Sequence, residues 1–428
     1  MKFFQLSHSL QLNHPNFYKH YQGANEQGST LQTLYLNLAG ETSVLTNAIF
    51  NMPQAQRAHY KMHFYQASQL VLPAAFPIRL GEHVEAFTLK EREEWSGTLS
   101  HTLMAQLDAL KQRPLQGRPY RIALVNGFGH NLGDTLLGCR ALAVFIGLLK
   151  TQLSEFTLDI LVSYFVPAAI RDWLAAFPEV DQMVTLSPTL VEFCDYDGYL
   201  DVSDVFATDW LETMPTVDAF LLAMGINPDS VMAEQKRNRI TLKATSSAQI
   251  DAWLSVYRSQ ESKLCYLAHS ASVPLRSMPT DFVRKLVDRL LGQCPQMTLI
   301  ADLDFAYQHP RLIPVADHLP TVDDLAALID KVDMVICVDS LVLHLSDALS
   351  CPTLCISATL SPDRLQTYYP HAQVCLIKEA SKLPAWQKGK VSESAWQEMQ
   401  PLYLQAWLET DLAIVDDFIG QNSESADV

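Results

Sequence analysis

The sequence predicts an α/β fold with two doubly wound domains in series that face a cleft, and an extra N-terminal region before them. The chain has 428 residues, enough for two or three domains. From Arg121 onward, short apolar runs alternate with helical stretches, which is typical of βαβ units and a parallel sheet. The alternation lapses over about 205–262 and then restarts, so two domains are the simplest arrangement.

The first alternation begins with an apolar run at 121–128 and continues through two helical stretches. Apolar runs predict strands at 121–128, 157–164, 181–187 and 198–203, and helices at 134–151 and 167–177. The second alternation predicts strands at 263–270, 296–302, 333–340 and 352–358, with helices at 279–291, 321–332 and 341–350. In a doubly wound domain, ligands bind beside the carboxyl ends of the strands.

The N-terminal region has weaker patterning than the rest of the chain. Residues 30–40 alternate like a strand, and 89–113 form an amphipathic helical pattern with Leu99, Leu103 and Leu107 at helical spacing. A helical tail at 392–420 is expected to pack back across the first domain. The resulting divisions are an N-terminal extension of mixed structure (1–117), a first doubly wound domain (118–228), an interdomain segment (229–261), a second doubly wound domain (262–390) and the C-terminal helix with a polar tail (391–428).

Composition narrows the class of protein. A formal net charge of -16, from 31 basic and 47 acidic residues, argues against nucleic acid as a partner. The eight cysteines form no CxxC pair, which fits a reducing compartment. The start of the chain has no signal-peptide core and no stretch approaches the length of a membrane span, so we expect a cytoplasmic protein with at most transient membrane contact.

The stretch VNGFGHNLGD (125–134) joins the first strand to its helix. Its glycines follow a GxGxxxG spacing, one residue longer than the dinucleotide fingerprint, which disfavours a nicotinamide-dependent oxidoreductase. Asp134 at the helix start would repel a diphosphate bound there, whereas a carboxylate is itself stabilised at that position. Asp134 is therefore a candidate general base, and the alternative is that it only caps the helix.

Two later stretches offer anion-binding groups. In 268–282, Ser270 and Ser272 supply hydroxyls and Arg276 a forked cation suited to phosphate oxygens, although a solvated polar loop would look the same. In 338–349, Asp339 ends a buried strand and Ser340 begins a helix whose backbone amides could hold a diphosphate. His344 lies one turn inside, and a lone histidine at such a position is more often a core residue than a ligand.

Two features look like metal-binding patterns, but neither has the context or the spacing of a metal site. Asp195 and Asp197 match the DxD pattern of metal-dependent sugar transferases, but they directly precede a predicted strand. The histidines at 8, 14 and 20 lack ligand spacing. We therefore assign no metal and no cofactor.

Taken in order, these stretches resemble glycosyltransferase family nine, the ADP-heptose:lipopolysaccharide heptosyltransferases, over about 119–390. Gly133 and Asp134 are similar to the end of the family's first loop. The segment FPEVDQMVTL (177–186) is similar to the family's PxVDxV segment, and YDGYLDV (196–202) is similar to its second-strand pattern. Asp339, Ser340, His344 and Leu345 match its Asp-Ser-x-x-x-His-Leu segment. The resemblance implies the GT-B architecture of two Rossmann-like domains.

The resemblance also implies roles for the residues. Asp134 becomes the catalytic base on an acceptor-side loop, and the donor diphosphate lies in the other domain, which removes the charge conflict in the first loop. The acceptor-side loop residues are Gly129, His130, Asn131 and Gly133, and the donor-binding residues are Ser270, Ser272, Arg276, Asp339, Ser340 and His344.

The expected function is a metal-independent, inverting transfer of a sugar, heptose by family, from a nucleotide-diphosphate donor such as ADP-heptose to a glycan or lipid-linked glycan of the lipopolysaccharide type. Three features depart from the family: Arg276 replaces a lysine, Leu341 replaces a glycine, and more than a hundred residues precede the first strand. Two alternatives remain open, a noncatalytic nucleotide-sugar binder and a protein-modifying heptosyltransferase of the autotransporter type, whose cysteine-rich iron finger is absent here.

Overall fold

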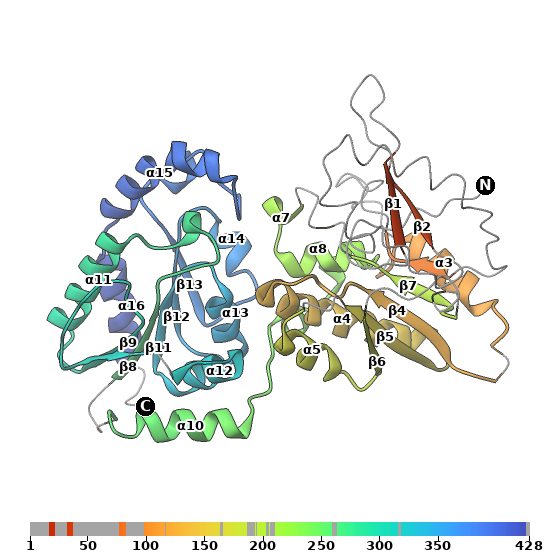
Figure 1. Ribbon diagram of the computed structural model, residues 1–428, viewed down its shortest axis with the longest axis horizontal. Coiled ribbons are helices and arrows are strands. Elements are labelled where there is room, and N and C mark those ends of the chain that lie inside the picture. Colours follow the sequence, from red (N-terminus) through yellow and green to blue (C-terminus); the bar gives the residue numbers. More distant parts are fainter. Residues whose placement is uncertain are drawn as a thin grey trace. The chain divides into compact units, whose positions relative to one another are not determined.

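The computed structural model of the chain (Figure 1) divides into two compact units, each with its own parallel sheet. Unit 1 is Met1–Leu211 with Val217–Met232, and unit 2 is Glu212–Thr216 with Ala233–Val428. The structure describes the backbone of 17–21 and 32–36, and residues 77–82, 98–115, 117–162, 166–185, 193, 195–202, 205, 210–258, 263–315 and 318–424. The side chains of the N-terminal histidines lie outside the described residues.

The sheet of the first unit is parallel throughout and has the strand order β3-β7-β4-β5-β6. The strands expected at 121–128, 157–164, 181–187 and 198–203 are confirmed. The strands are β3 (Ile78–Leu80), β4 (Tyr120–Val125), β5 (Phe156–Val162), β6 (Val180–Thr185) and β7 (Gly198–Leu200), with helices α4 (Leu132–Gln152), α5 (Ala168–Ala175), α7 (Trp210–Thr213) and α8 (Thr216–Ala223).

The N-terminal extension contributes directly to this sheet. β3 pairs in parallel with β7, so that Ile78 lies opposite Gly198. The helix expected within 89–113 is α3 (His101–Lys111), capped by Ser100, and it buries Leu103, Leu107 and Leu110. The part of that expectation before residue 98 lies outside the described residues. The expected strand near 30–40 is β2 (Gln32–Leu36), antiparallel to β1 (Phe17–Tyr21).

Helix α4 corrects the expectation that no stretch is long enough to cross a membrane. It has 21 residues and its composition is apolar enough for a span. Of its most apolar 18-residue stretch, 56% is buried inside the protein, where Leu136, Ala141 and Phe145 pack in the core. Length and composition alone do not distinguish a membrane helix from such a core helix, and this burial is that of a core helix.

The second sheet has the order β10-β9-β8-β11-β12-β13, with every pair parallel. Counted from β8, this is the Rossmann order 3-2-1-4-5-6. The strands are β8 (Lys263–Ala268), β9 (Met297–Ala301), β10 (Leu312–Pro314), β11 (Met334–Cys337), β12 (Thr353–Ser357) and β13 (Ala372–Leu376), and the helices within this order are α11 (Thr280–Gln293), α12 (Val322–Lys331), α13 (Leu341–Ala348) and α14 (Pro362–Leu365). The predicted α/β fold class of two doubly wound, Rossmann-like domains is confirmed.

Burial in the second sheet explains its sequence pattern. All residues of β9, β11 and β12 are buried, which is why these strands are continuous apolar runs. α11 is amphipathic instead and buries the face formed by Phe282, Val283, Leu286, Val287, Leu290 and Leu291.

The C-terminal tail forms α15 (Glu393–Leu408) and α16 (Ala413–Glu424). We expected this tail to pack back across the first domain, and in the structure it packs on α11 of the second unit. The rings of Phe282 and Trp407 lie 4.8 Å apart, and Arg289 forms an ion pair with Asp416. Figure 1 shows α11, α15 and α16 gathered on one side of the second sheet.

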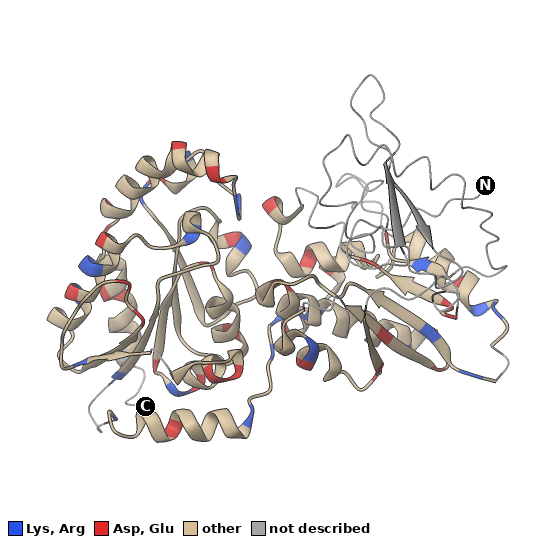
Figure 2. Ribbon diagram, in the orientation of Figure 1, with Lys and Arg blue, Asp and Glu red and all other residues tan. Residues whose placement is uncertain are grey.

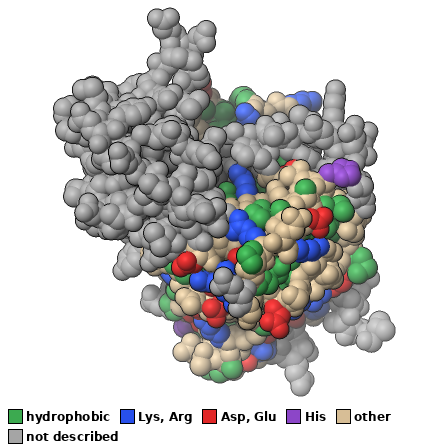
Figure 3. Space-filling model, turned by 90° about the vertical axis from the view of Figure 1, so that its right-hand side faces the viewer, with side chains coloured by type: hydrophobic (Ala, Val, Ile, Leu, Met, Phe, Trp, Pro, Cys, Tyr) green, Lys and Arg blue, Asp and Glu red, His purple; other side chains and the backbone are tan. Residues whose placement is uncertain are grey.

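The segment between the two sheets contains two further helices, α9 (Ala233–Lys236) and α10 (Ala244–Leu254). α10 packs on α12, and Lys331 and Lys243 pair with acidic residues across this contact. Lys and Arg are dispersed over the described parts of both units (Figure 2). On the face that Figure 3 shows, the described basic and acidic side chains are interspersed with apolar ones. Any preference for an anion must therefore come from a local arrangement of side chains.

Candidate functional site

The strand order places a crevice at one point of the second sheet. β8 and β11 are neighbours, with Leu267 opposite Ile336, but the chain leaves them toward opposite edges of the sheet. Ligands of doubly wound sheets bind at such a switch point, outside the carboxyl ends of the strands. The segments that leave these two strand ends carry most of the predicted donor-binding residues.

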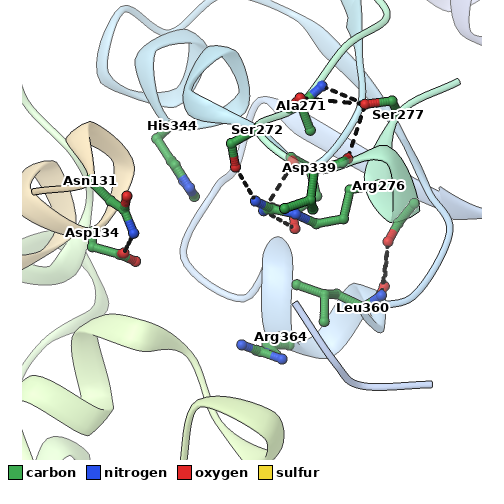
Figure 4. A network of polar contacts seen from close by, with 12 residues as sticks. Asn131, Asp134, Ala271, Ser272, Arg276, Ser277, Asp339, His344, Leu360 and Arg364 are labelled. Carbon is green, nitrogen blue, oxygen red and sulfur yellow. Dashed lines mark hydrogen bonds and ion pairs between the residues drawn. The ribbon is translucent and has the colours of Figure 1, made fainter. Parts of the chain in front are cut away.

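Arg276 is the centre of this site (Figure 4). Its Nη1 donates to Asp339 Oδ2 at 2.8 Å and to the Asp339 carbonyl oxygen at 3.2 Å, and its Nη2 donates to Ser272 Oγ at 2.9 Å. The Arg276 side chain is 21% exposed and that of Asp339 7%. Three residues predicted from two separate stretches of sequence are therefore assembled into one network, which keeps the guanidinium accessible.

The loop that carries Arg276 is held by a serine that sequence reasoning missed. Ser277 Oγ accepts from the backbone N–H of Ala271 at 2.9 Å and donates to the Val273 carbonyl at 3.1 Å. The backbone N–H of Met278 closes the loop on the His269 carbonyl. A serine after a short turn is too common in sequences to have signalled this role. Ser270 is exposed and lies outside the described hydrogen-bond network around Arg276.

Helix α13 begins beside Asp339 without the usual side-chain cap. Ser340 is its N-cap residue, yet its hydroxyl accepts no cap hydrogen bond, and Ser340 Oγ is buried with no partner in the described part of the chain. A Ser at this position normally satisfies one of the unpaired N–H groups of the first turn. The uncapped helix start is therefore suited to an anion that accepts from these N–H groups.

Two further side chains lie on this helix. Leu341, which replaces the family's glycine, is the first helical residue and is half-buried, and its φ is not positive. A glycine is therefore not required there by the backbone. His344, one turn further, has its Nδ1 2.7 Å from the hydroxyl oxygen of Tyr369. Tyr369 was missed because it lies in an unpatterned loop 25 residues away.

The loop between β4 and α4 (126–131) in the first unit is also at a switch point, because β4 pairs with both β5 and β7. Three of its residues have positive φ: Asn126 (61°), Gly127 (51°) and Gly129 (83°). For Asn126 this conformation is strained, and such strain is concentrated at functional loops. Phe128 anchors the loop, because its buried ring packs edge-on against Phe220 at 5.0 Å.

Asp134 lies in the first turn of α4, at its third residue. Asn131 is the N-cap residue, and its amide Nδ2 donates to Asp134 Oδ2 at 2.9 Å (Figure 4). The N-cap position itself therefore belongs to Asn131, and Asp134 contacts that residue from within the first turn; the catalytic role of Asp134 stays a prediction. Of the other acceptor-side residues, Gly133 precedes it in the helix, Gly129 forms the turn, and His130 is exposed.

Of the acidic pair before β7, Asp197 has a structural position, whereas Asp195 is exposed. Asp197 is buried and accepts from both terminal nitrogens of Arg118, at 2.6 and 2.9 Å, and from the Arg121 backbone N–H. Arg121 in turn pairs with Asp159 at 3.0 Å. Asp197 therefore holds the N-terminal end of β4 and is occupied with these bonds, as its place at a strand entrance indicated.

Among the described residues, no three His, Cys, Asp or Glu side chains come close enough together to hold a metal ion. The described cysteines are free thiols, and burial raises the pKa of Cys139 and of Cys351 to about 12. These thiols stay protonated at neutral pH and pack as small apolar groups.

Comparison with known proteins identifies the class of enzyme. Residues 320–395 match the family described as Glycosyltransferase family 9 (heptosyltransferase). No curated protein matches the chain. The matched residues include β11, Asp339, Ser340 and the whole of α13. The predicted resemblance to glycosyltransferase family nine is confirmed, and the chain is a glycosyltransferase.

Three solved structures illustrate what the chain is similar to in fold. A glycosyl transferase of family 9 from Veillonella parvula is 13% identical, with 67% of this chain and 97% of that chain covered and a TM-score of 0.44. The ADP-heptose lps heptosyltransferase II of E. coli is 14% identical, with coverage of 67% and 99% and a TM-score of 0.43. The dodecameric iron-containing heptosyltransferase TibC, from enterotoxigenic E. coli and solved in complex with ADP-D-beta-D-heptose, is 15% identical, with coverage of 72% and 76% and a TM-score of 0.49.

Proposed function

We propose that this glycosyltransferase moves a sugar, heptose in the first instance, from a nucleoside-diphosphate donor to a hydroxyl of a glycan or lipid-linked glycan, with inversion and without a metal ion. The observation that carries the proposal is the Arg276, Ser272 and Asp339 network beside an uncapped helix start, at the switch point of a Rossmann-type sheet. The family match covers Asp339 and the helix start, whereas Ser272 and Arg276 lie before it.

The second unit would bind the donor's diphosphate. Asp339 already neutralises much of the charge of Arg276, so the guanidinium alone is a weak anion site. Its Nη2 contacts only the hydroxyl of Ser272 among the described residues, and this is a neutral partner that a phosphate oxygen can replace. The amides at the start of α13 add donors and the positive end of the helix dipole. Together these groups stabilise a leaving diphosphate, the role that a metal ion has in other transferases.

The first unit would supply the base. Asp134 is partly exposed, and the amide of Asn131 fixes one carboxylate oxygen. As the acceptor oxygen attacks the anomeric carbon, its proton passes to Asp134, the bond from that carbon to the phosphate oxygen breaks, and the bonding electrons leave with the nucleoside diphosphate. The proton then passes to solvent. One displacement from the opposite side inverts the anomeric centre.

The donor site can be tested by nucleotide binding. We expect one of ADP, GDP, UDP and CDP, with ADP first in order, to raise the melting temperature of the protein and to bind in calorimetry. Arg276→Ala should weaken that affinity by about 10- to 100-fold, because it removes charge-assisted hydrogen bonds, and Arg276→Lys should recover part of it.

The matched control is Arg284→Ala. Arg284 is an exposed arginine of the same unit that stacks over Phe305, so its loss changes the net charge equally. Equal weakening by both alanine variants would mean that overall charge governs binding, against the proposal. Binding without transfer to any glycan from ADP-heptose would instead indicate the noncatalytic binder, and transfer only to protein would indicate the protein-modifying type.

A further inference from the structure

The described part of the second unit contains a buried tyrosine in contact with the predicted donor-binding histidine. Tyr369 Oη lies 2.7 Å from His344 Nδ1, and the two rings are perpendicular, with centroids 5.8 Å apart. His344 is on α13, while Tyr369 is in the loop between α14 and β13. The contact therefore links the phosphate-facing helix to a different strand connection.

The position of the Tyr369 hydroxyl is fixed by its own loop. The ring is only 7% exposed. The backbone N–H of Tyr369 donates to the Gln366 carbonyl at 2.9 Å, and the Tyr369 carbonyl accepts from Ala372 at 3.1 Å. Gln366 Oε1 accepts from the backbone N–H of Val374 in β13 at 2.7 Å. The sheet edge thus holds the hydroxyl in place.

The hydroxyl keeps its proton at any physiological pH. Burial raises the pKa of Tyr369 far above its usual range, the Asn238 side chain opposes this in part, and the carboxylates of Asp347 and Asp339 raise the pKa further. A protonated phenol donates to Nδ1 of a neutral imidazole, and Nε2 then carries the ring proton. Side chains on a helix lean toward its N-terminus, so His344 leans toward the uncapped start of α13.

We propose that Tyr369 is a positioning residue that acts through His344: it holds the imidazole in one orientation and one tautomer, so that the Nε2–H is presented to the donor's diphosphate. This inference deepens the proposed function and rests on it. Tyr369 itself touches no substrate. Loss of its hydroxyl removes the contact at Nδ1, so that more of the ordering of the ring would fall to a bound phosphate.

The test uses Tyr369→Phe, which keeps the ring and removes the hydroxyl, and the neighbouring Tyr368→Phe as its control. Tyr368 is a close match because its hydroxyl also takes part in a hydrogen bond, which it accepts from Lys236 Nζ at 2.8 Å, and in the variant its ring keeps the contact with that ammonium. We expect Tyr369→Phe to weaken binding of ADP, or of the diphosphate of that panel that binds most tightly, by about three- to tenfold. Tyr368→Phe should leave this affinity within about twofold.

A double-mutant cycle separates positioning from a general effect on the fold. In a His344→Ala background, Tyr369→Phe should change the affinity no further, because the residue through which it acts is gone. Provided that the wild type binds, two results would overturn the inference. One is that Tyr369→Phe weakens the affinity by the same factor with and without His344, and the other is that the single variant does not change the affinity. If the wild type binds no nucleoside diphosphate, the proposed function fails first and the inference fails with it.

Discussion

At the scale of single residues, the buried carboxyl group of Asp347 has a pKa that its surroundings change. It lies on α13, is 1% exposed, and its Oδ2 accepts from the backbone N–H of Asn238 at 3.0 Å. Its other oxygen has no hydrogen-bond partner within the described residues. Burial therefore raises the pKa of Asp347 from 3.8 to about 6, although the Asn238 N–H acts against the rise. The folded protein binds this proton more tightly than the unfolded chain.

The stability of the protein should therefore depend on pH through Asp347. Because the folded pKa lies above the unfolded one, the contribution is fully present below about pH 4 and is lost as the pH rises through about 6, a change of about 3 kcal/mol. Asp347→Asn cannot lose a proton. Its melting temperature relative to the wild type should rise by several degrees between pH 4 and pH 7, as measured by calorimetry at matched ionic strength.

Asp108→Asn is the control for this comparison, because the side chain of Asp108 is 67% exposed. Its melting temperature should differ from that of the wild type by a small amount that stays constant between pH 4 and pH 7. A melting-temperature difference for Asp347→Asn that does not change between pH 4 and pH 7 would show that the carboxylate is not held protonated by burial.

At the level of residues, the sequence allowed the types and positions of site groups to be predicted, but not their contacts. Asp339 and Arg276 were recognised because each follows a predicted strand, where doubly wound sheets bind ligands. Their ion pair spans 63 positions, and nothing local in the sequence encodes it. The partners of Asp347 and His344 were missed for the same reason. The roles of the site residues in catalysis stay predictions.

Among the elements, α4 and the loop before it decide where Asp134 lies. The loop is anchored by Phe128, and the Phe128 ring fits against α4 only because residue 138 is a glycine. A Cβ at Gly138 would lie 2.1 Å from Phe128 Cγ, far inside van der Waals contact. Because Gly138 has no side chain, the Phe128 ring can pack there and hold in place the loop that leads to Asn131 at the start of α4.

Gly138→Ala should displace the Phe128 ring and with it the 126–131 loop. We expect a loss of about 1–3 kcal/mol of stability, together with slower sugar transfer, because Asp134 and Asn131 would shift. Gly147→Ala tests the same substitution in the same helix, where a Cβ meets nothing within 4 Å. That variant should be as stable as the wild type, or more stable by up to about 1 kcal/mol, since alanine favours helix.

The two variants would be compared by thermal melting and by the initial rate of transfer. Equal effects of Gly138→Ala and Gly147→Ala would mean that the contact with Phe128 does not hold the loop.

At the level of elements, the alternation of apolar runs predicted four strands in each sheet, because buried parallel strands are nearly continuous in apolar residues. The edge strands β3, β10 and β13 were not predicted. For β3 the reason is its length and its partner. It has only three residues, and it pairs with β7 across 120 positions, so its existence depends on a non-local partner. The burial of α4 is likewise a property of the fold, since its composition alone equally suits a membrane.

In the molecule as a whole, the proposed chemistry is divided between two units, each with a switch point in its own sheet. The second unit has the Rossmann strand order and the Arg276 network, which suit an anionic leaving group. The first has the strained loop and Asp134, which suit an incoming hydroxyl. The order of motifs along the chain predicted this division, and both the division and the domain boundaries stay predictions.

The most direct test of this division is a single-turnover measurement on Asp134→Asn with saturating ADP-heptose and a glycan acceptor, beside calorimetry of ADP binding to the same protein. The account predicts that transfer slows by about 10²- to 10⁴-fold, as expected for loss of a general base, and that the affinity for ADP stays within about twofold of the wild type. Transfer at the wild-type rate, or a large loss of ADP affinity with unchanged turnover, would contradict it.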